Sequence, residues 1–112
     1  MNTVAEVVAR AREAQRAYES YTQEQVDAVV TAVGWTGYSN AESLAELAVQ
    51  ETGLGNYEDK VRKNRRKTFG TLRDLKHARS VGVIDEDRAR GITEIAKPVG
   101  VIAASTPITN PA

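Results

Sequence analysis

The stretch that decides the fold is KPVGVIAASTPITNPA, Lys97–Ala112. Its apolar part, Val99–Ser105, is apolar on both faces, which predicts a strand of the kind found inside a parallel sheet covered by helices. Such a strand needs neighbours on both sides to pair its backbone groups. Only Ile92–Pro98 reads as another extended segment, and no second central strand precedes it. We therefore expect a chain that is truncated at its C-terminus.

Four helices are predicted before that stretch, from apolar residues that recur every three or four positions. The first runs to about Ser20 and the second begins at Thr22. Capping-box pairs mark both starts, Thr3 with Glu6 and Thr22 with Gln25. Gly34 is predicted to end the second helix, followed by a turn over GWTGYSN (34–40). Asn40 and Asn56 are predicted to cap the third and fourth helices, and the fourth helix is predicted over Tyr57–Arg79.

Composition places the chain among ordinary globular proteins. Of 112 residues, 41% are apolar and 27% are charged, with a formal net charge of zero. The absence of cysteine excludes disulfides, thiolate metal sites and a cysteine nucleophile within these residues, and fits a reducing cytoplasm. The N-terminal residues lack the features of a secretory or transit peptide. No apolar run approaches the roughly 20 residues that span a bilayer. We expect a cytoplasmic protein with no membrane partner and no metal.

The densest charged feature is KVRKNRRK, Lys60–Lys67. Tyr57–Arg79 holds nine Lys or Arg against three acids, a net charge of +6. One interpretation is a site for nucleic acid or for a cofactor phosphate, and the other is the solvated face of a long helix. Nearby aromatic residues are few, which disfavours nucleic acid as a partner. A small helical binding module that uses this basic helix stays open as an alternative function.

The motif Pro-x-Gly-Val-x-x-x-x-x-Pro-x-x-Asn-Pro, at Pro98–Pro111, resembles the first cofactor-domain strand of the aldehyde dehydrogenase superfamily. AREAQRAYESYTQEQVDAVV (11–30) and ETGLGNYEDKVRKN (51–64) resemble the N-terminal helices of its CoA-acylating branch. The likeness is greatest to acylating sulfoacetaldehyde dehydrogenases, through ELAVQETGLGN (46–56), KNRRKTFGTLRDLK (63–76) and GITEIAKPVGV (91–101). The resemblance implies an α/β parent fold with a Rossmann-type cofactor domain. Residues 1–91 would be its N-terminal helical segment, and residues 92–112 the extended segment and first, truncated strand.

The resemblance also implies the chemistry of a complete enzyme. Such enzymes oxidise an aldehyde through a cysteine thiolate, pass hydride to NAD or NADP, and release the acyl group to CoA. By its place in the motif, Asn110 would be the amide donor that stabilises the oxyanion. Five residues would lie where the cofactor passes the end of the strand, namely Ser105, Thr106, Pro107, Ile108 and Thr109. The catalytic cysteine is absent from these residues, so the chain alone is expected to be inactive.

The resemblance leaves the substrate open. Sulfoacetaldehyde is the first expectation. The alternatives are acetaldehyde or propionaldehyde, or the aldehyde half of a bifunctional aldehyde–alcohol dehydrogenase. The full-length enzyme is expected to be a homo-oligomer.

Overall fold

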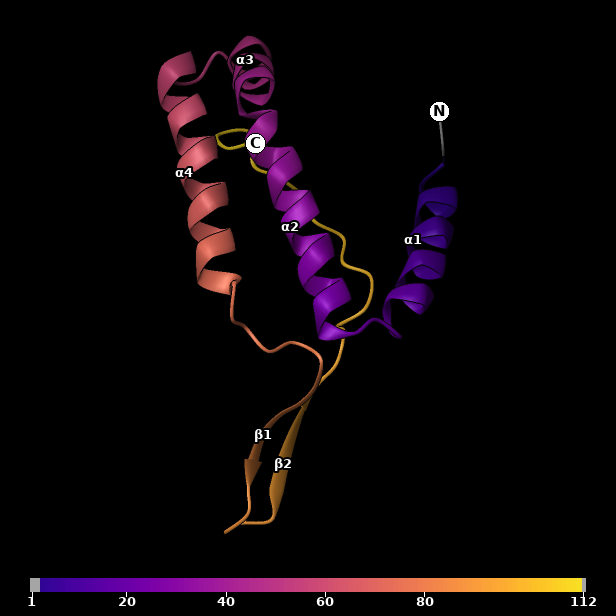
Figure 1. The fold of residues 1–112 in the computed structure, drawn as a ribbon. Helices are drawn as coiled ribbons and strands as arrows, with labels where there is room; N and C mark the ends of the chain where they lie inside the picture. The colour runs from indigo at the N-terminus through magenta and orange to yellow at the C-terminus, as the bar shows by residue number, and fades with distance from the viewer. Residues whose placement is uncertain (1–2, 112) are drawn as a thin grey trace. The chain divides into compact units, whose positions relative to one another are not determined.

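The structure, a computed structural model, describes residues 3–111 of the chain. In chain order its elements are α1 (Val4–Tyr18), α2 (Gln23–Ser39), α3 (Ala41–Thr52), α4 (Tyr57–Leu75), β1 (Gly82–Asp87) and β2 (Ile92–Ala96) (Figure 1). The prediction of a mostly helical piece with about four helices and one or two strands is confirmed. The described chain divides into two compact units. One consists of the residues up to 26 with residues 79–103, and the other of residues 27–78 with residues 104–111.

The predicted capping pairs form at the starts of the first two helices. The Thr3 amide donates to Glu6 Oε2 at 2.7 Å, and the Glu6 amide donates to Thr3 Oγ1 at 3.3 Å. Thr22 and Gln25 exchange the same two bonds at 2.9 and 3.3 Å. Asn40 occupies the N-cap of α3, but its side chain makes no capping bond and donates instead to the Thr36 carbonyl at 2.8 Å.

Helix α2 continues through Gly34 and ends at Ser39, so the predicted helix end at Gly34 and the turn over residues 34–40 are wrong. The reason is a close approach between α2 and α4. A Cβ atom added to Gly34 would lie 2.5 Å from Leu72 Cδ1 and 2.7 Å from Leu72 Cγ. The glycine that reads as a stop signal is therefore a packing residue that lets the two helices come together.

The best-buried residues lie between α3 and α4. Ala41 and Ala45 are fully buried and Ala48 is nearly so, and the spacing of these three residues puts their small side chains on one face of α3. Facing them, α4 buries Lys60 and Asn64, and the Asn64 amide donates to the Ala41 carbonyl at 3.3 Å. Helix α4 ends at Leu75, one turn earlier than predicted.

The two strands form an antiparallel hairpin within one unit. Strand β2 was predicted as an extended segment, whereas β1 was missed. Their register pairs Gly82 with Ala96 and Asp87 with Ile92, with a bulge at Ile84. The Arg79 guanidinium donates to the carbonyls of Val83 and Ile84 and so holds the bulged region.

The predicted strand over Val99–Ser105 is wrong, because no residue of that segment is in a strand. The physical reason is that no other strand among residues 3–111 pairs with it. Without a partner, an apolar extended segment has no ladder of hydrogen bonds to define it as a strand.

Candidate functional site

The segment after residue 103 holds the predicted oxyanion donor. Residues 107–110 form a turn, in which the Asn110 amide N–H donates to the Pro107 carbonyl at 3.0 Å. The Asn110 side chain is exposed and makes no hydrogen bond to any residue from 3 to 111. The predicted turn is therefore present, and the side-chain amide of Asn110 has both donors open to a ligand. Its role in catalysis stays a prediction.

The segment predicted to meet the cofactor, residues 105–109, is exposed throughout. Its hydroxyl groups, from Ser105, Thr106 and Thr109, suit hydrogen bonding to a nicotinamide dinucleotide. Because the segment is exposed, these hydroxyl groups are accessible to a ligand, and their part in a cofactor site stays a prediction. These residues therefore fit a nicotinamide dinucleotide in chemical type.

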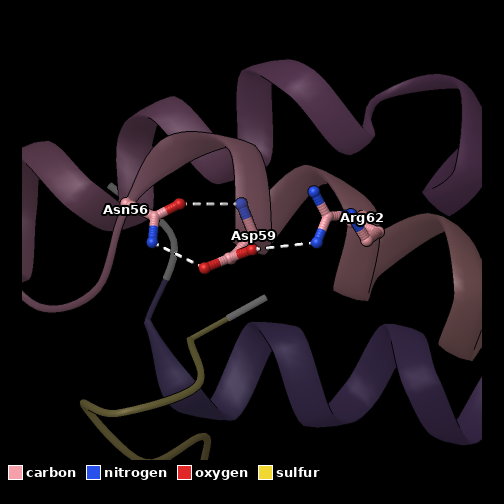
Figure 2. Close-up of polar contacts among 3 residues, drawn as sticks. All are labelled: Asn56, Asp59 and Arg62. Atoms are coloured by element: carbon pink, nitrogen blue, oxygen red, sulfur yellow. Dashed lines mark hydrogen bonds and ion pairs between the residues drawn. The ribbon is translucent and has the colours of Figure 1, made fainter.

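The basic run, Lys60–Lys67, begins next to a group of polar side chains that contact one another at the start of α4 (Figure 2). Asn56 accepts a hydrogen bond from the Asp59 amide at 2.9 Å and donates from its own side chain to Asp59 Oδ2 at 2.6 Å. The Arg62 guanidinium lies 3.2 Å from Asp59 Oδ1. One of the cations in the run is therefore tied to the capping residues of its own helix.

Other members of the run face α3. Arg65 pairs with Glu42 on α3 at 2.7 Å, and its guanidinium lies 5.9 Å from the ring centre of Tyr38. The pKa of Lys63 is lowered by its partial burial and then by the charge of Lys60. Much of the basic run thus serves contacts within the helical unit, which weakens its interpretation as a free anion-binding face.

An apolar groove lies between α2 and α4 and was not predicted from the sequence. It has a volume of about 970 Å³, and Trp35 and Phe69 in it are 66% and 62% exposed. Its lining consists of Asp27, Val30, Thr31, Trp35, Tyr38, Phe69, Leu72, Arg73, Leu75 and Lys76. The predicted helix end at Gly34 placed Trp35 in the expected turn over residues 34–40 and so away from this face. The helical spacing of residues continues through Gly34, and following it to Ser39 would have placed Trp35 on the face of α2 that lines the groove.

The part of the chain that the structure describes contains neither a group of metal ligands nor a membrane-spanning helix. No three His, Cys, Asp or Glu side chains among residues 3–111 lie close enough together to hold a metal ion. Within the same residues, no helix is both long enough and apolar enough to cross a membrane.

Comparisons with known proteins complete the description. No family model matches the chain. The sulfoacetaldehyde dehydrogenase (acylating) of Cupriavidus necator is 60% identical over 111 residues, which cover 97% of this chain and 22% of that protein. The enzyme of the same name from Bilophila wadsworthia is 48% identical and is matched over 24% of its length. A bifunctional aldehyde-alcohol dehydrogenase of Escherichia coli is 40% identical over 94% of this chain and 12% of its own.

A comparison with solved structures also finds an aldehyde dehydrogenase. The crystal structure of a probable aldehyde dehydrogenase from Listeria monocytogenes superposes with a TM-score of 0.77 and 32% sequence identity. The superposition covers 82% of this chain and 20% of that one. The chain spans 22–24% of the length of the sulfoacetaldehyde dehydrogenases that it matches, and 12% of the length of the bifunctional enzyme.

Proposed function

We propose that this chain, whose relatives over nearly its whole length are acylating aldehyde dehydrogenases, is the N-terminal portion of such an enzyme. The complete protein would convert an aldehyde, CoA and NAD or NADP into an acyl-CoA and the reduced cofactor. Sulfoacetaldehyde is the proposed aldehyde. The observation that carries the proposal is the 60% identity to an acylating sulfoacetaldehyde dehydrogenase across 97% of the chain.

The proposed role of Asn110 follows from its chemistry and setting. When a thiolate attacks an aldehyde, the carbonyl oxygen becomes an oxyanion that fixed donors stabilise. A side-chain amide is a neutral donor that does not ionise, and that of Asn110 is exposed at the last position of a turn. Pro111 follows it and fixes its own φ, which stiffens the chain there. The thiolate itself would come from outside these 112 residues, which contain no cysteine.

The substrate is tested with a full-length protein that contains this chain. Reduction of NAD or NADP is followed with sulfoacetaldehyde, acetaldehyde and propionaldehyde, each with and without CoA. The proposal predicts CoA-dependent reduction that is fastest, by kcat/KM, with sulfoacetaldehyde. Faster turnover of acetaldehyde or propionaldehyde would transfer the proposal to those aldehydes. Reduction that proceeds equally well without CoA would contradict an acylating enzyme.

The role of Asn110 is tested in the same full-length protein. Asn110→Ala should lower kcat by about 10²–10³-fold, the usual cost of one oxyanion donor. Asn40→Ala removes another exposed asparagine amide, one far along the chain from Asn110, and should leave kcat unchanged. An Asn110→Ala enzyme with the parent kcat would remove the assignment.

Two further features belong to the proposal for the complete protein. We propose that it is cytoplasmic and forms a homo-oligomer. The alternative of a small helical binding module lacks a specific observation in its favour, because Arg62 and Arg65 of the basic run are paired with Asp59 and Glu42.

A further inference from the structure

A cavity of about 530 Å³ lies in the unit that contains α1. It is bounded on one side by α1 and on the other by the extended segment that follows β2. The lining residues are Val8, Arg12, Gln15, Arg16, Glu19, Val101 and Ala103. None of them belongs to the segment from Ser105 to Asn110, which is predicted to meet the cofactor and to supply the oxyanion donor.

One polar atom in the lining lacks a partner although it is buried. The side-chain nitrogen of Gln15, Nε2, is out of contact with solvent and has no hydrogen-bond acceptor among residues 3–111. A buried amide donor without an acceptor costs free energy, and native proteins rarely leave one in that state. The position of Gln15 in the cavity lining means that a ligand with an acceptor oxygen would remove this cost.

Two cations flank that amide. Arg12 and Arg16 are one helical turn apart, so both guanidinium groups lie on the same side of α1 as Gln15. Neither forms an ion pair with any carboxylate in the described part of the chain, and Glu19 makes none there either. The lining therefore carries two positive charges against one negative charge.

The rest of the lining is apolar. Val8 on α1 and Val101 and Ala103 opposite offer only aliphatic surface. A guanidinium presents its N–H groups in a fork that matches the oxygens of a carboxylate, sulfonate or phosphate. The cavity thus combines donors for an oxyanion with a wall for a short alkyl group.

We propose that this cavity binds a small organic oxyanion. Arg12, Gln15 and Arg16 hold its charged oxygens, and its alkyl part lies against Val8, Val101 and Ala103. Glu19 repels a second negative charge, which favours a ligand with a single anionic head. This assignment is independent of the proposed dehydrogenase activity.

The test is a titration of the 112-residue chain with ethanesulfonate, propionate and inorganic phosphate, followed by the NMR signals of the Gln15 side-chain NH₂ and the arginine Nε–H groups. A saturable shift of the Gln15 signal is expected with at least one probe. The probe that binds most tightly identifies the head group as sulfonate, carboxylate or phosphate. Shifts that grow linearly with all three probes, without saturation, would overturn the proposal.

Matched variants separate the site from general charge effects. Arg16→Gln and Arg12→Gln should each weaken binding about tenfold or more, the effect of losing a charged hydrogen bond. Gln15→Leu should abolish the reporter signal and weaken binding measured by calorimetry. Arg10→Gln makes the same charge change on the same helix outside the cavity and should leave the affinity unchanged. An equal loss in the Arg10 and Arg16 variants, with α-helix content preserved by circular dichroism, would contradict the site.

Discussion

Asp87 holds the hairpin turn with its carboxylate. Its Oδ1 accepts from the Arg90 amide at 3.0 Å, and its Oδ2 lies 2.5 Å from Arg90 Nε. The side-chain bond from Arg90, followed by the backbone bond from the same residue, lowers the pKa of Asp87 below its usual value of 3.8. A lowered folded-state pKa means that the carboxylate stabilises the turn at neutral pH and that this contribution is lost as the pH falls through the folded-state pKa.

The first prediction concerns acid titration of this turn. Amide chemical shifts of residues 88–91 should move toward unfolded values as the pH drops below 3.8, and Asp87→Asn should remove that transition. Asp85→Asn changes the same charge in β1, where Asp85 makes no ion pair with a described residue, and should keep the transition. An unchanged titration in the Asp87 variant would show that another group controls the turn.

Asn56 provides a second test at the residue scale. Its side chain caps α4 by accepting from the Asp59 amide, so Asn56→Ala should lower the free energy of unfolding by about 1 kcal/mol. Asn40 occupies the same position before α3 but makes no capping bond, and Asn40→Ala should cost clearly less. Urea denaturation followed by circular dichroism measures both. Equal losses would mean that the Asn56 cap contributes nothing specific.

At the scale of elements, the contact between α2 and α4 depends on a missing side chain. Gly34→Ala gains helix propensity worth up to about 1 kcal/mol, but its Cβ would lie 2.5 to 2.7 Å from three atoms of Leu72. Because the branch point of Leu72 is among those atoms, the whole side chain must move. Overpacking of this kind usually costs about 1–3 kcal/mol, so we expect a net loss of stability.

Gly70 on α4 is the matched control for that substitution. A Cβ atom there meets nothing within 4 Å, so Gly70→Ala should stabilise the protein by up to about 1 kcal/mol. Thermal unfolding of the two variants and the parent measures the contrast. Stabilisation by both alanines would show that the approach of Leu72 to Gly34 is not a constraint in solution.

The features that the sequence predicted correctly are local. Thr3 with Glu6 and Thr22 with Gln25 are three residues apart, so their capping bonds are specified by near neighbours. Gly34 was misinterpreted because its partner, Leu72, lies on another helix. Strand β1 was missed because its acidic residues and its bulge at Ile84 hide the alternation that marks a strand.

The candidate site follows the same rule. The turn that Asn110 closes is a local feature of a Pro-containing segment, and the structure has it. The oxyanion that Asn110 is proposed to stabilise forms only with a thiolate, which these residues do not include. The cavity beside α1 was not predicted, because Arg12 and Arg16 on α1 are far in sequence from Val101, which lines the other side.

At the scale of the whole molecule, composition sets a limit on activity. In the proposed mechanism a cysteine thiolate of the enzyme attacks the aldehyde before hydride leaves, and none of the 112 residues is a cysteine. The isolated chain should therefore show no CoA-dependent reduction of NAD or NADP, measured by absorbance with sulfoacetaldehyde as substrate. The full-length protein serves as the positive control. Turnover by the purified chain would contradict the proposed thiolate mechanism.

The groove between α2 and α4 also makes the molecule its own optical reporter. Trp35 is the only tryptophan in the chain, and two-thirds of its surface is in water. An indole that leaves water for an apolar contact emits at shorter wavelength. Binding of a polypeptide or small molecule over the groove would therefore shift the emission of Trp35 to shorter wavelength, without an added label. Iodide quenches only exposed rings, so the loss of quenching on binding would measure how far the Trp35 ring is covered.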